Sequence, residues 1–511
     1  MNKQISKIDA FFRKIDKSGL ALSYKDVRMA TGYSDIIPSD QRMVTSSKFS
    51  TNVMLKIPII SSPMDTVTEY KMAIAMAKTG GSGIIHKALS PKMQASMIGK
   101  VKHHLSAFIS DPICIKPDDT VGGVIKMGKE KGYKFYSFLV RDGSGKIIGL
   151  VTHNDFDFCP NPDKKISEIM SKEIIFGKSG TTIQQAYKQM LENKKKILPI
   201  FNRDGSLKGI YTWADVTRIV LKSSEKYNVD SSGSLIVGAA IGVGPDLEER
   251  MELLSQEKVN VVVIDTAHGD SKKVIETIKF CKKYYPHIDV VAGNISEPDS
   301  AKRLVKAGVD GIKVGQGPGS ICTTRIIAGI GCPQVTAIYN CSKAVRGSGV
   351  PICADGGIEF SGDIAIAIAA GADNVMLGSV LAGTTETPGE IIRRGGRTVK
   401  IYRGMGSLGA MIDNQASRER YGQGGITTTD KLVPEGIESE VDYKGNVEIV
   451  LSMMIGGLRA GMGYVGAKNL SSLHRKANFH LITNSGLTES HPHGLTNIQD
   501  APNYHYRGEK L

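Results

Sequence analysis

Short apolar runs recur along most of the chain, each followed by glycine or polar residues and then by a segment with a helix-like pattern. The eight runs are IPIISS at 57–62, SGIIHK at 82–87, SLIVGAA at 234–240, VNVVVID at 259–265, IDVVAGN at 288–294, GIKVG at 311–315, VPICADG at 350–356 and ADNVMLG at 372–378. Continuous apolar strands that alternate with helices are typical of a parallel sheet buried on both faces. The sequence therefore predicts an α/β fold, a closed (β/α)8 TIM barrel whose chemistry lies on the loops at the carboxyl ends of the strands.

The interval between the second and third runs is far too long for one helix and one loop. It contains an internal repeat, in which RDGSGKIIGLVTHNDF from Arg141 matches RDGSLKGIYTWADV from Arg203. A duplicated small α/β module inserted into a barrel loop is the expected arrangement. The predicted domains are 1–105 for the first part of the barrel, 106–222 for the insert, and 223–511 for the rest of the barrel with a flap at 412–445 and a C-terminal tail.

Composition fits a soluble, cytoplasmic protein of 511 residues, with 41% apolar and 23% charged residues. No apolar run has the length of a membrane span, and the N-terminus lacks a signal-peptide core. The seven cysteines are scattered without a CxxC pair, so neither a disulfide framework nor a zinc site is indicated. The net charge of +14 would suit nucleic acid or an anionic metabolite, but the basic residues are dispersed. Nucleic acid is therefore not expected as the main partner.

The segment at 311–334 carries the candidate chemistry, because it delivers a cysteine on a glycine-rich loop. Glycines at 315, 317 and 319 allow backbone conformations that other residues resist, so the main chain can approach a ligand or ion closely. Cys322 is followed by Thr323, Thr324 and the cation Arg325, a setting that favours the thiolate, which is the nucleophilic form. Taken alone, a free cysteine is more often a buried and inert one.

Further glycine-rich loops are predicted on the same rim of the barrel. Asp355, Gly356 and Gly357 follow the seventh strand, and Gly378 and Ser379 follow the eighth. Such loops suit a phosphate held by backbone N–H groups, although they also occur as simple tight turns. The long polar, glycine-rich segment at 412–445 is typical of a mobile flap over an active site.

Seven motifs occur in a specific order along the chain. They are SSPMDTVTE at 61–69, GPGSICTTR, ADGGI, VMLGS, YRGMGSLGAM, KLVPEGIE and ESHPH. With these motifs the chain resembles the IMP dehydrogenase family over nearly its whole length. The resemblance implies an oxidoreductase that converts IMP to XMP with NAD+, the committed step of guanine nucleotide synthesis. Cys322 would attack C2 of the purine, and the covalent thioimidate would then be hydrolysed.

The resemblance also implies individual site residues. Arg420 and Tyr421 on the flap support hydrolysis, and Thr324 positions or deprotonates the water; because arginine is normally protonated, the geometric role of Thr324 is the firmer one. The implied IMP-binding residues are Ser62, Met64, Asn294, Ser320, Asp355, Gly356, Gly357, Met376, Gly378, Ser379, Tyr402, Gly404, Met405, Gly406 and Glu435. The implied cofactor-binding residues are Asp265, Thr266, Ala267, Gly315 and Gly317.

A monovalent cation and an oligomer follow from the same resemblance. Potassium would be bound by carbonyl groups of Gly317, Gly319 and Cys322 and completed by Glu489, Ser490 and His491 from the tail of a neighbouring subunit. The implied assembly is a homotetramer, or an octamer formed by two tetramers. His491 could instead bind a metal with His493, which two tail histidines support only weakly.

The insert resembles a tandem CBS (Bateman) pair. In such pairs a threonine and an aspartate near the end of each repeat contact the ribose of a bound nucleotide. The matching residues are Thr152, Asp155, Thr212 and Asp215. The implied ligand is an adenine or guanine nucleotide, and a purely structural or assembly role is the alternative.

Three residues depart from the pattern of the family, and two other functions compete. Gln316 stands where an aliphatic residue is usual, Lys313 where arginine is common, and Asp270 where a polar residue or histidine is typical. GMP reductase shares the barrel, the cysteine loop and the covalent cysteine, but Arg420, Tyr421 and KLVPEGIE favour the dehydrogenase. A nucleotide sensor or nucleic-acid-binding protein without catalysis is the alternative from another class.

Overall fold

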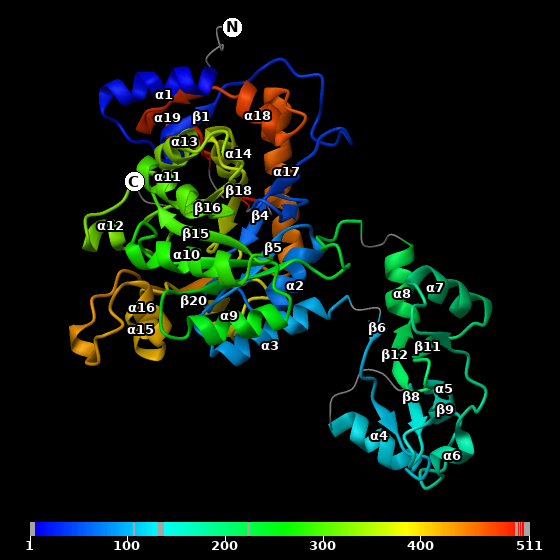
Figure 1. Ribbon diagram of the computed structural model, residues 1–511. Coiled ribbons are helices and arrows are strands. Elements are labelled where there is room, and N and C mark those ends of the chain that lie inside the picture. Colours follow the sequence, from blue (N-terminus) through cyan, green and yellow to red (C-terminus); the bar gives the residue numbers. More distant parts are fainter. Residues whose placement is uncertain are drawn as a thin grey trace. The chain divides into compact units, whose positions relative to one another are not determined.

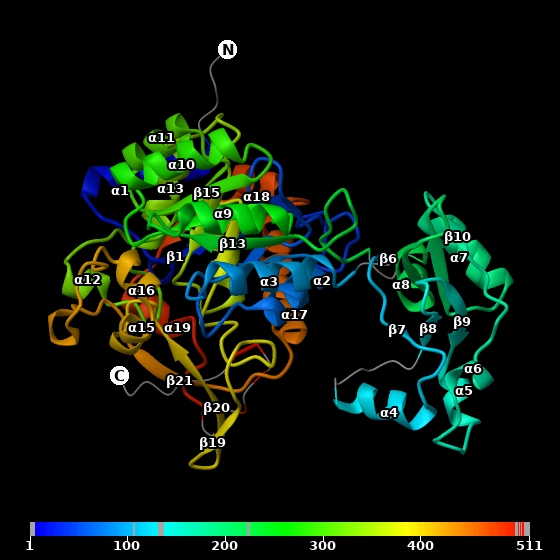
Figure 2. The same ribbon diagram turned by 60° about the horizontal axis from the view of Figure 1, so that its bottom comes forward.

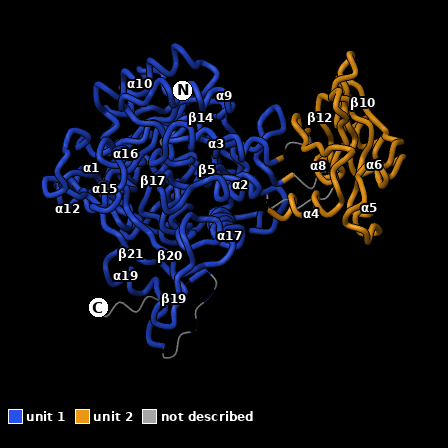
Figure 3. Tube along the Cα trace, turned by 90° about the horizontal axis from the view of Figure 1, so that it is seen from below, with its two compact units in different colours: residues 1–104, 226–511 blue, residues 105–225 orange. Residues whose placement is uncertain are grey.

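The computed structural model describes residues 6–105, 108–130, 137–221, 225–495, 499, 501, 503 and 504. The predicted insert boundaries at 106 and at 222–223 lie outside the described residues. The chain forms two compact units, one made of residues 1–104 and 226–511 and the other of residues 105–225 (Figure 3).

The first unit contains a closed barrel of parallel strands in the order β13-β14-β15-β16-β17-β18-β4-β5 (Figure 1). The strands are β4 (Ile59–Ser61), β5 (Ser82–Ile85), β13 (Val237–Ile241), β14 (Val261–Asp265), β15 (Asp289–Ile295), β16 (Gly311–Val314), β17 (Ile352–Asp355) and β18 (Asn374–Leu377). Nearly every residue of these strands is buried, as expected for a sheet covered on both faces. Each strand coincides with one of the eight apolar runs or overlaps it, and the predicted barrel is confirmed.

Helices surround the barrel on its outside (Figure 2). They are α2 (Tyr70–Lys78), α3 (Pro91–Lys102), α9 (Leu247–Gln256), α10 (Lys272–Tyr284), α11 (Pro298–Ala307), α13 (Gln334–Ala344), α14 (Ser361–Ala370) and α17 (Val447–Val465). The short helix α12 (Thr324–Ile327) belongs to the loop that carries Cys322. α14 is buried along most of its length, because α17 packs on it very closely. A Cβ at Gly457 of α17 would lie 1.9 Å from the Ser361 hydroxyl, so this contact requires glycine. None of the helices in the described chain is both long and apolar enough to cross a membrane.

A segment near the N-terminus and one near the C-terminus pair with each other beside the barrel. β1 (Val27–Met29) pairs antiparallel with β22 (Phe479–Leu481), and α1 (Lys7–Ser18) contacts α13. Phe12 of α1 stacks on Tyr339 of α13, with ring centroids 3.7 Å apart. The smaller elements of this unit are η1 (Tyr24–Asp26), β2 (Ser47–Lys48), β3 (Met54–Leu55), α18 (Leu470–Lys476) and α19 (Asn484–Glu489).

The segment predicted as a flap begins in α15 (Leu408–Asp413) and continues through α16 (Gln415–Arg420) and η2 (Thr429–Lys431) to β21 (Glu438–Asp442). β21 pairs over all its five residues with β20 (Arg397–Arg403), which also pairs with β19 (Ile392–Arg394). The last part of the predicted flap is therefore a strand of a three-stranded sheet. In the part before β21, Gly436 forms an isolated antiparallel bridge with Cys322. The name flap is used below for residues 412–437.

The second unit repeats one order of elements, β-α-β-β-α. The first copy has β7 (Cys114–Ile115), α4 (Val121–Glu130), β8 (Phe138–Arg141), β9 (Ile147–Val151) and α5 (His153–Asp157); the second has β10 (Gly177–Lys178), α7 (Ile183–Glu192), β11 (Ile197–Phe201), β12 (Leu207–Thr212) and α8 (Trp213–Val220). In both copies the first strand is parallel to the second, and the second is antiparallel to the third. β6 (Phe108–Ile109) pairs with β12, and α6 (Ile166–Ile169) lies between the copies in sequence. The repeated sequence thus folds as a repeated structure.

The ion pair between α1 and the segment after α13 gives a pH-dependent prediction for stability. Arg346 donates hydrogen bonds of 2.9 and 3.0 Å to the Asp9 carboxylate, and the guanidinium lowers the pKa of Asp9 to about 2. Because the folded pKa lies below the ordinary value of about 3.9, the pair stabilises the folded state above that pH and loses this effect as the pH falls towards 2. Asp9→Asn should lower the free energy of unfolding at pH 7 by about 0.5–1 kcal/mol, given that Arg346 is largely exposed.

Thermal denaturation of Asp9→Asn and wild type from neutral to acidic pH would test this. The difference between the two proteins should shrink as the pH is lowered. Asp16→Asn on the same helix, whose side chain is exposed, is the matched control and should show little change at any pH. An equal difference at all pH values would contradict the assignment.

Candidate active site

A cavity of about 160 Å³ lies at the carboxyl ends of the barrel strands. The predicted residues that line it are Ser62, Met64, Ala267, Asn294, Gly315, Gly317, Gly319, Ser320, Cys322, Thr324, Asp355, Gly356, Gly357, Met376, Gly378, Ser379, Tyr402, Gly404, Met405, Arg420, Tyr421 and Glu435. These residues come from distant parts of the sequence, and the barrel brings them together at one rim. The volume is below the roughly 300–1,000 Å³ of typical ligand sites. The flap residues Arg420 and Tyr421 occupy part of the space.

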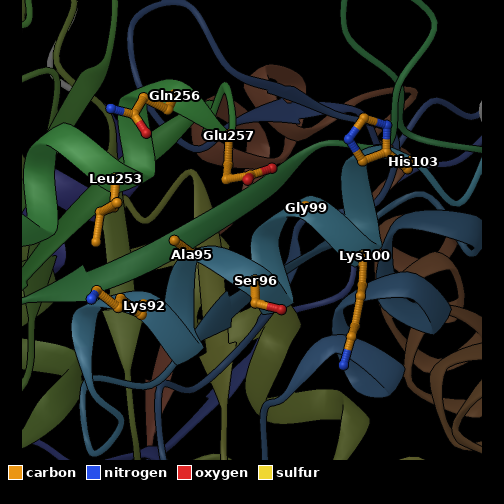
Figure 4. Close-up of a pocket in the computed structure, with 9 residues that line it drawn as sticks. All are labelled: Lys92, Ala95, Ser96, Gly99, Lys100, His103, Leu253, Gln256 and Glu257. Carbon is orange, nitrogen blue, oxygen red and sulfur yellow. The ribbon is translucent and has the colours of Figure 1, made fainter. Parts of the chain in front are cut away.

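A second cavity, of about 500 Å³, lies between α3 and α9 on the outer wall of the barrel (Figure 4). It is lined by Lys92, Ala95, Ser96, Gly99, Lys100, His103, Leu253, Gln256 and Glu257. A Cβ at Gly99 would lie 2.5 Å from the Glu257 carboxylate, so the missing side chain makes room for that group. None of the predicted site residues lines this second cavity. The candidate catalytic residues therefore lie at the rim of the barrel.

Cys322 is held between the barrel and the end of the flap. Its Sγ lies 3.2 Å from the Thr324 hydroxyl, and the side chain is partly exposed to the cavity. The flanking backbone is fixed by hydrogen bonds from Thr323 N–H to the Glu435 carbonyl (2.9 Å) and from Ile437 N–H to the Ile321 carbonyl (3.0 Å). The thiol therefore has a defined position next to a hydroxyl that can hold a water molecule.

The sequence suggested that the charge of Arg325 lies next to the Cys322 thiol, and the structure differs. Its guanidinium donates to the carbonyl groups of Gln316 (3.0 Å) and Cys332 (2.5 Å). Burial lowers the pKa of Arg325 below its ordinary value. Arg325 thus stabilises the shape of the cysteine loop, because a buried guanidinium needs hydrogen-bond acceptors and finds them in the backbone.

The glycines of the cysteine loop are required by neighbouring parts of the protein. Gly315 has φ 145°, and a Cβ there would lie 2.1 Å from the Asp355 carbonyl oxygen. Gly317 has φ 77°, and a Cβ would lie 2.5 Å from Cγ of Arg325. The close approach that the sequence indicated is therefore an approach of the loop to β17 and to Arg325.

A buried lysine joins the two carboxylates that the sequence assigned to different ligands. Lys313 Nζ donates to Asp265 (2.8 Å) and to Asp355 (2.7 Å), and it also contacts the Asn294 side-chain oxygen. Asn294 in turn donates to Asp355 (2.8 Å) and to the Gly315 carbonyl (2.6 Å). The sequence analysis treated Lys313 only as a departure from the family pattern. A lysine within the apolar run GIKVG was nevertheless a signal, since lysine is almost never fully buried unless it is paired.

The flap is closed over the side of the cavity that carries Asp265 and Ala267. Arg420 forms an ion pair with Asp265, and its carbonyl accepts a hydrogen bond of 3.1 Å from Ala267 N–H. Tyr421 packs against Gly406, where a Cβ would lie 2.5 Å from the tyrosine ring. Burial raises the pKa of Tyr421, which keeps its hydroxyl protonated and able to donate a hydrogen bond. In this arrangement Arg420 takes the place on Asp265 that a cofactor ribose was predicted to occupy.

The opposite side of the cavity is formed by the predicted phosphate loops. A Cβ at Gly378 would lie 3.1 Å from the Tyr402 hydroxyl and 3.2 Å from Sδ of Met64. Glycine at this position therefore lets both side chains pack closely against the loop. Burial raises the pKa of Tyr402. Gly356 and Gly357 both have positive φ and turn the chain directly after β17. Backbone N–H groups in such turns are suited to an anionic group.

The remaining predicted residues lie outside the cavity lining. Asp265 and Thr266 stand just behind it, with Thr266 donating to the Gly293 carbonyl (2.8 Å). Glu489 ends α19, and His491 contacts the Tyr504 hydroxyl at 2.9 Å. The described parts of the chain contain no cluster of three metal-binding side chains. In the described chain the carbonyl oxygens of Gly317 and Cys322 accept no hydrogen bond, whereas that of Gly319 accepts one from Cys322 N–H. Two free carbonyl groups on one loop fit a monovalent cation.

In the second unit the predicted threonine and aspartate pairs cap helices. Thr152 donates to Asp155 from its backbone (2.7 Å) and hydroxyl (2.8 Å) at the start of α5. At the start of α8, Thr212 donates to Asp215 over 2.6 Å. The two pairs have equivalent places in the repeat, and capping explains their residue types without a ligand.

Fold and cavity together define a (β/α)8-barrel enzyme with a cysteine loop, two glycine-rich loops and a closing flap at the carboxyl rim. The model of the "IMP dehydrogenase / GMP reductase domain" matches residues 21–493. This chain belongs to the IMP dehydrogenase / GMP reductase family.

Relatives match it over almost their whole length. The inosine-5'-monophosphate dehydrogenase of Halalkalibacterium halodurans is 44% identical, covering 96% of this chain and 99% of that protein. Those of Aquifex aeolicus and Bacillus subtilis are 45% and 42% identical, covering 94% and 96% of this chain and 97% and 99% of those proteins. A solved structure of a Trypanosoma brucei GMP reductase variant with guanosine 5'-monophosphate has a TM-score of 0.85 at 36% identity, covering 94% of this chain and 100% of that one.

Removal of the Lys313 charge should destabilise the barrel strongly. Lys313→Met would leave the buried Asp355 without a cation and Asp265 with Arg420 as its remaining partner, and breaking a buried pair typically costs about 3–5 kcal/mol. Lys282→Met is the matched control, because Lys282 also pairs with an aspartate (2.7 Å to Asp310) but is partly exposed. Its cost should be about 1 kcal/mol. Chemical denaturation of both variants measures the difference, and equal losses would show that the Lys313 cluster has no special role.

Proposed function

We propose that this chain oxidises IMP to XMP with NAD+ as the hydride acceptor, the committed step of guanine nucleotide synthesis. The observation that carries the proposal is the meeting of the motif residues at one cavity, with the Cys322 thiol beside Thr324 and the Arg420–Tyr421 pair facing it. Relatives named inosine-5'-monophosphate dehydrogenase, at 42–45% identity over nearly the full chain, support the same activity.

In the first step Cys322 loses its thiol proton to solvent and its sulfur forms a bond to C2 of the purine, and the hydrogen at C2 leaves with its electron pair. NAD+ supplies the acceptor for this hydride. Asp265, Thr266 and Ala267 would hold the cofactor with Gly315 and Gly317, since Ala267 and the two glycines line the cavity and Asp265 and Thr266 lie just behind it. Asp355 would accept hydrogen bonds from the ribose hydroxyls of IMP, and the loops at 356–357 and 378–379 would bind its phosphate.

In the second step water replaces sulfur at C2 and the thiol is regenerated. Thr324 is 3.2 Å from the sulfur and can orient a water molecule towards the carbon bound to it. Arg420 and Tyr421 would donate hydrogen bonds and stabilise negative charge as the carbon–oxygen bond forms. Covalent catalysis separates oxidation from hydrolysis, so each step can use its own set of groups.

The two steps require different positions of the flap. Asp265 is proposed to bind the cofactor ribose, yet in the closed structure it pairs with Arg420. Because one carboxylate would serve both partners, Arg420 could pair with Asp265 for hydrolysis only once the cofactor ribose no longer occupied that carboxylate. This order follows from the shared position of the two groups.

Potassium, oligomerisation and regulation belong to the same proposal. The carbonyl groups of Gly317, Gly319 and Cys322 would bind K+, with Glu489, Ser490 and His491 supplied by a neighbouring subunit in a tetramer or octamer. The second unit would bind an adenine or guanine nucleotide at its two threonine–aspartate pairs, and the protein would act in the cytoplasm.

Exchange of K+ for a bulky organic cation should lower the steady-state rate several-fold. Full activity in potassium-free buffer would remove the cation from the proposal.

Cys322→Ala should abolish the reaction, because the nucleophile is lost. The assay follows NADH absorbance and XMP formation after mixing IMP and NAD+ with wild type or variant. Cys332→Ala is the matched control, since this cysteine lies on the same loop but outside the cavity lining, and it should remain active. NADPH-dependent release of ammonia from GMP, without NADH formation from IMP, would assign the chain to the reductase branch. Binding of nucleotides without either reaction would favour a sensor.

Arg420→Ala should slow hydrolysis much more than hydride transfer, because Arg420 is proposed to act only in the second step. The expected result is a normal burst of NADH followed by a slow steady state, with the covalent adduct accumulating on Cys322. Mass spectrometry of the quenched protein would detect the adduct. Arg418→Ala is the control, since Arg418 contacts only Gln415 within α16 through its side-chain hydrogen bonds. Equal slowing of both steps by Arg420→Ala would refute the flap assignment.

A further inference from the structure

The flap carries a second ion pair to the barrel rim, one residue before Arg420. Glu419 Oε2 lies 2.8 Å from Nζ of Lys87, which follows β5. Both side chains are largely buried, with 18% and 11% of their surfaces exposed. Neither residue was noticed in the sequence as part of the site, and neither is needed for the two chemical steps described above.

The loop after β13 leaves space for the side chains of this pair. A Cβ at Gly242 would lie 2.2 Å from Nζ of Lys87, and a Cβ at Gly244 would lie 2.6 Å from the Glu419 carboxylate. Neither glycine has a positive φ, so their backbone conformation does not demand glycine. The missing side chains instead provide space for the two charged groups.

The charges around Lys87 favour the closed position of the flap. The carboxylate nearest to Lys87 on the barrel itself is Asp246, with Oδ1 at 3.8 Å. The other oxygen of Asp246 accepts two hydrogen bonds from Arg250, at 2.5 and 2.9 Å. Within the described chain, Oδ1 of Asp246 accepts no hydrogen bond. Lys87 therefore has a close, well-directed partner only when Glu419 is docked.

We propose that the Glu419–Lys87 pair is a latch that holds the flap closed during hydrolysis, with Glu419 acting as a positioning residue for Arg420 and Tyr421. In the described structure α16 forms two ion pairs with the barrel, Glu419 with Lys87 and Arg420 with Asp265. The second must break each time the cofactor binds to Asp265. The first lies outside the lining of the cavity and can set how strongly the flap closes. This inference rests on the proposed function for its catalytic consequence.

A weaker latch should change two steps in opposite directions. Hydrolysis needs the closed flap and should slow, whereas the cofactor competes with Arg420 for Asp265 and should bind the covalent adduct more tightly. A partly buried hydrogen bond between charged groups shifts such an equilibrium by about tenfold. Glu419→Gln should therefore slow hydrolysis by about tenfold and strengthen inhibition by excess NAD+ by a similar factor, leaving the NADH burst unchanged.

Hydrogen exchange gives a readout that does not depend on activity. The amide of Ala267 donates to the Arg420 carbonyl, so its protection reports closure of the flap directly. Exchange of this amide should be about tenfold faster in Glu419→Gln and in Lys87→Met than in wild type. The charge-exchanged double variant, Glu419→Lys with Lys87→Glu, should restore part of the protection. Asp430→Asn, an exposed flap carboxylate, is the matched control and should behave like wild type.

The exchange and kinetic results together test the Glu419–Lys87 latch. Faster exchange with slower hydrolysis and stronger NAD+ inhibition supports the latch. Unchanged exchange at Ala267 in both single variants overturns it, whatever the activity. A loss of burst and hydrolysis in equal measure, with wild-type exchange, would also overturn it. A wild-type protein that makes no NADH from IMP would refute the proposed function, while the exchange data would still test the latch.

Discussion

The site depends on one buried ammonium group that compensates carboxylates from two different strands. Lys313 on β16 pairs with Asp265 at the end of β14 and with Asp355 at the end of β17, and it contacts Asn294 on β15. Four consecutive barrel strands are thus linked by one charge. Without it, two carboxylates would be desolvated close together, which is unfavourable by several kcal/mol in a protein interior. The same ion pairs therefore stabilise the barrel and fix the positions of the site carboxylates.

Close approach between backbone and side chains is the second constraint. Gly315 passes the Asp355 carbonyl, Gly406 receives the Tyr421 ring, and Gly244 receives the Glu419 carboxylate, each at distances that a Cβ would not allow. These glycines belong to three separate loops, and each accommodates another part of the protein. The glycine-rich motifs thus shape a cavity whose walls and flap interlock. A ligand enters a site that is already largely organised.

The closed flap explains how one small site can serve two reactions. Asp265 faces either the proposed cofactor or Arg420, and Glu419 docks beside it on Lys87. The two anchors of the flap lie on the barrel, Asp265 at the end of β14 and Lys87 just after β5. The far end of the flap is held by the pairing of β21 with β20.

The sequence by itself determined the barrel, the repeated insert and the family, because strand periodicity, internal repetition and ordered motifs are local properties. It also identified most residues that line the cavity, including Cys322, Thr324, Arg420 and Tyr421. Only the tertiary structure decided the partners of Lys313, the pairing of Glu419 with Lys87 and the direction of Arg325. Lys87 and Glu419 are 332 residues apart. Such contacts depend on strand register around the closed barrel and on the path of the flap, and no local pattern of residues records either.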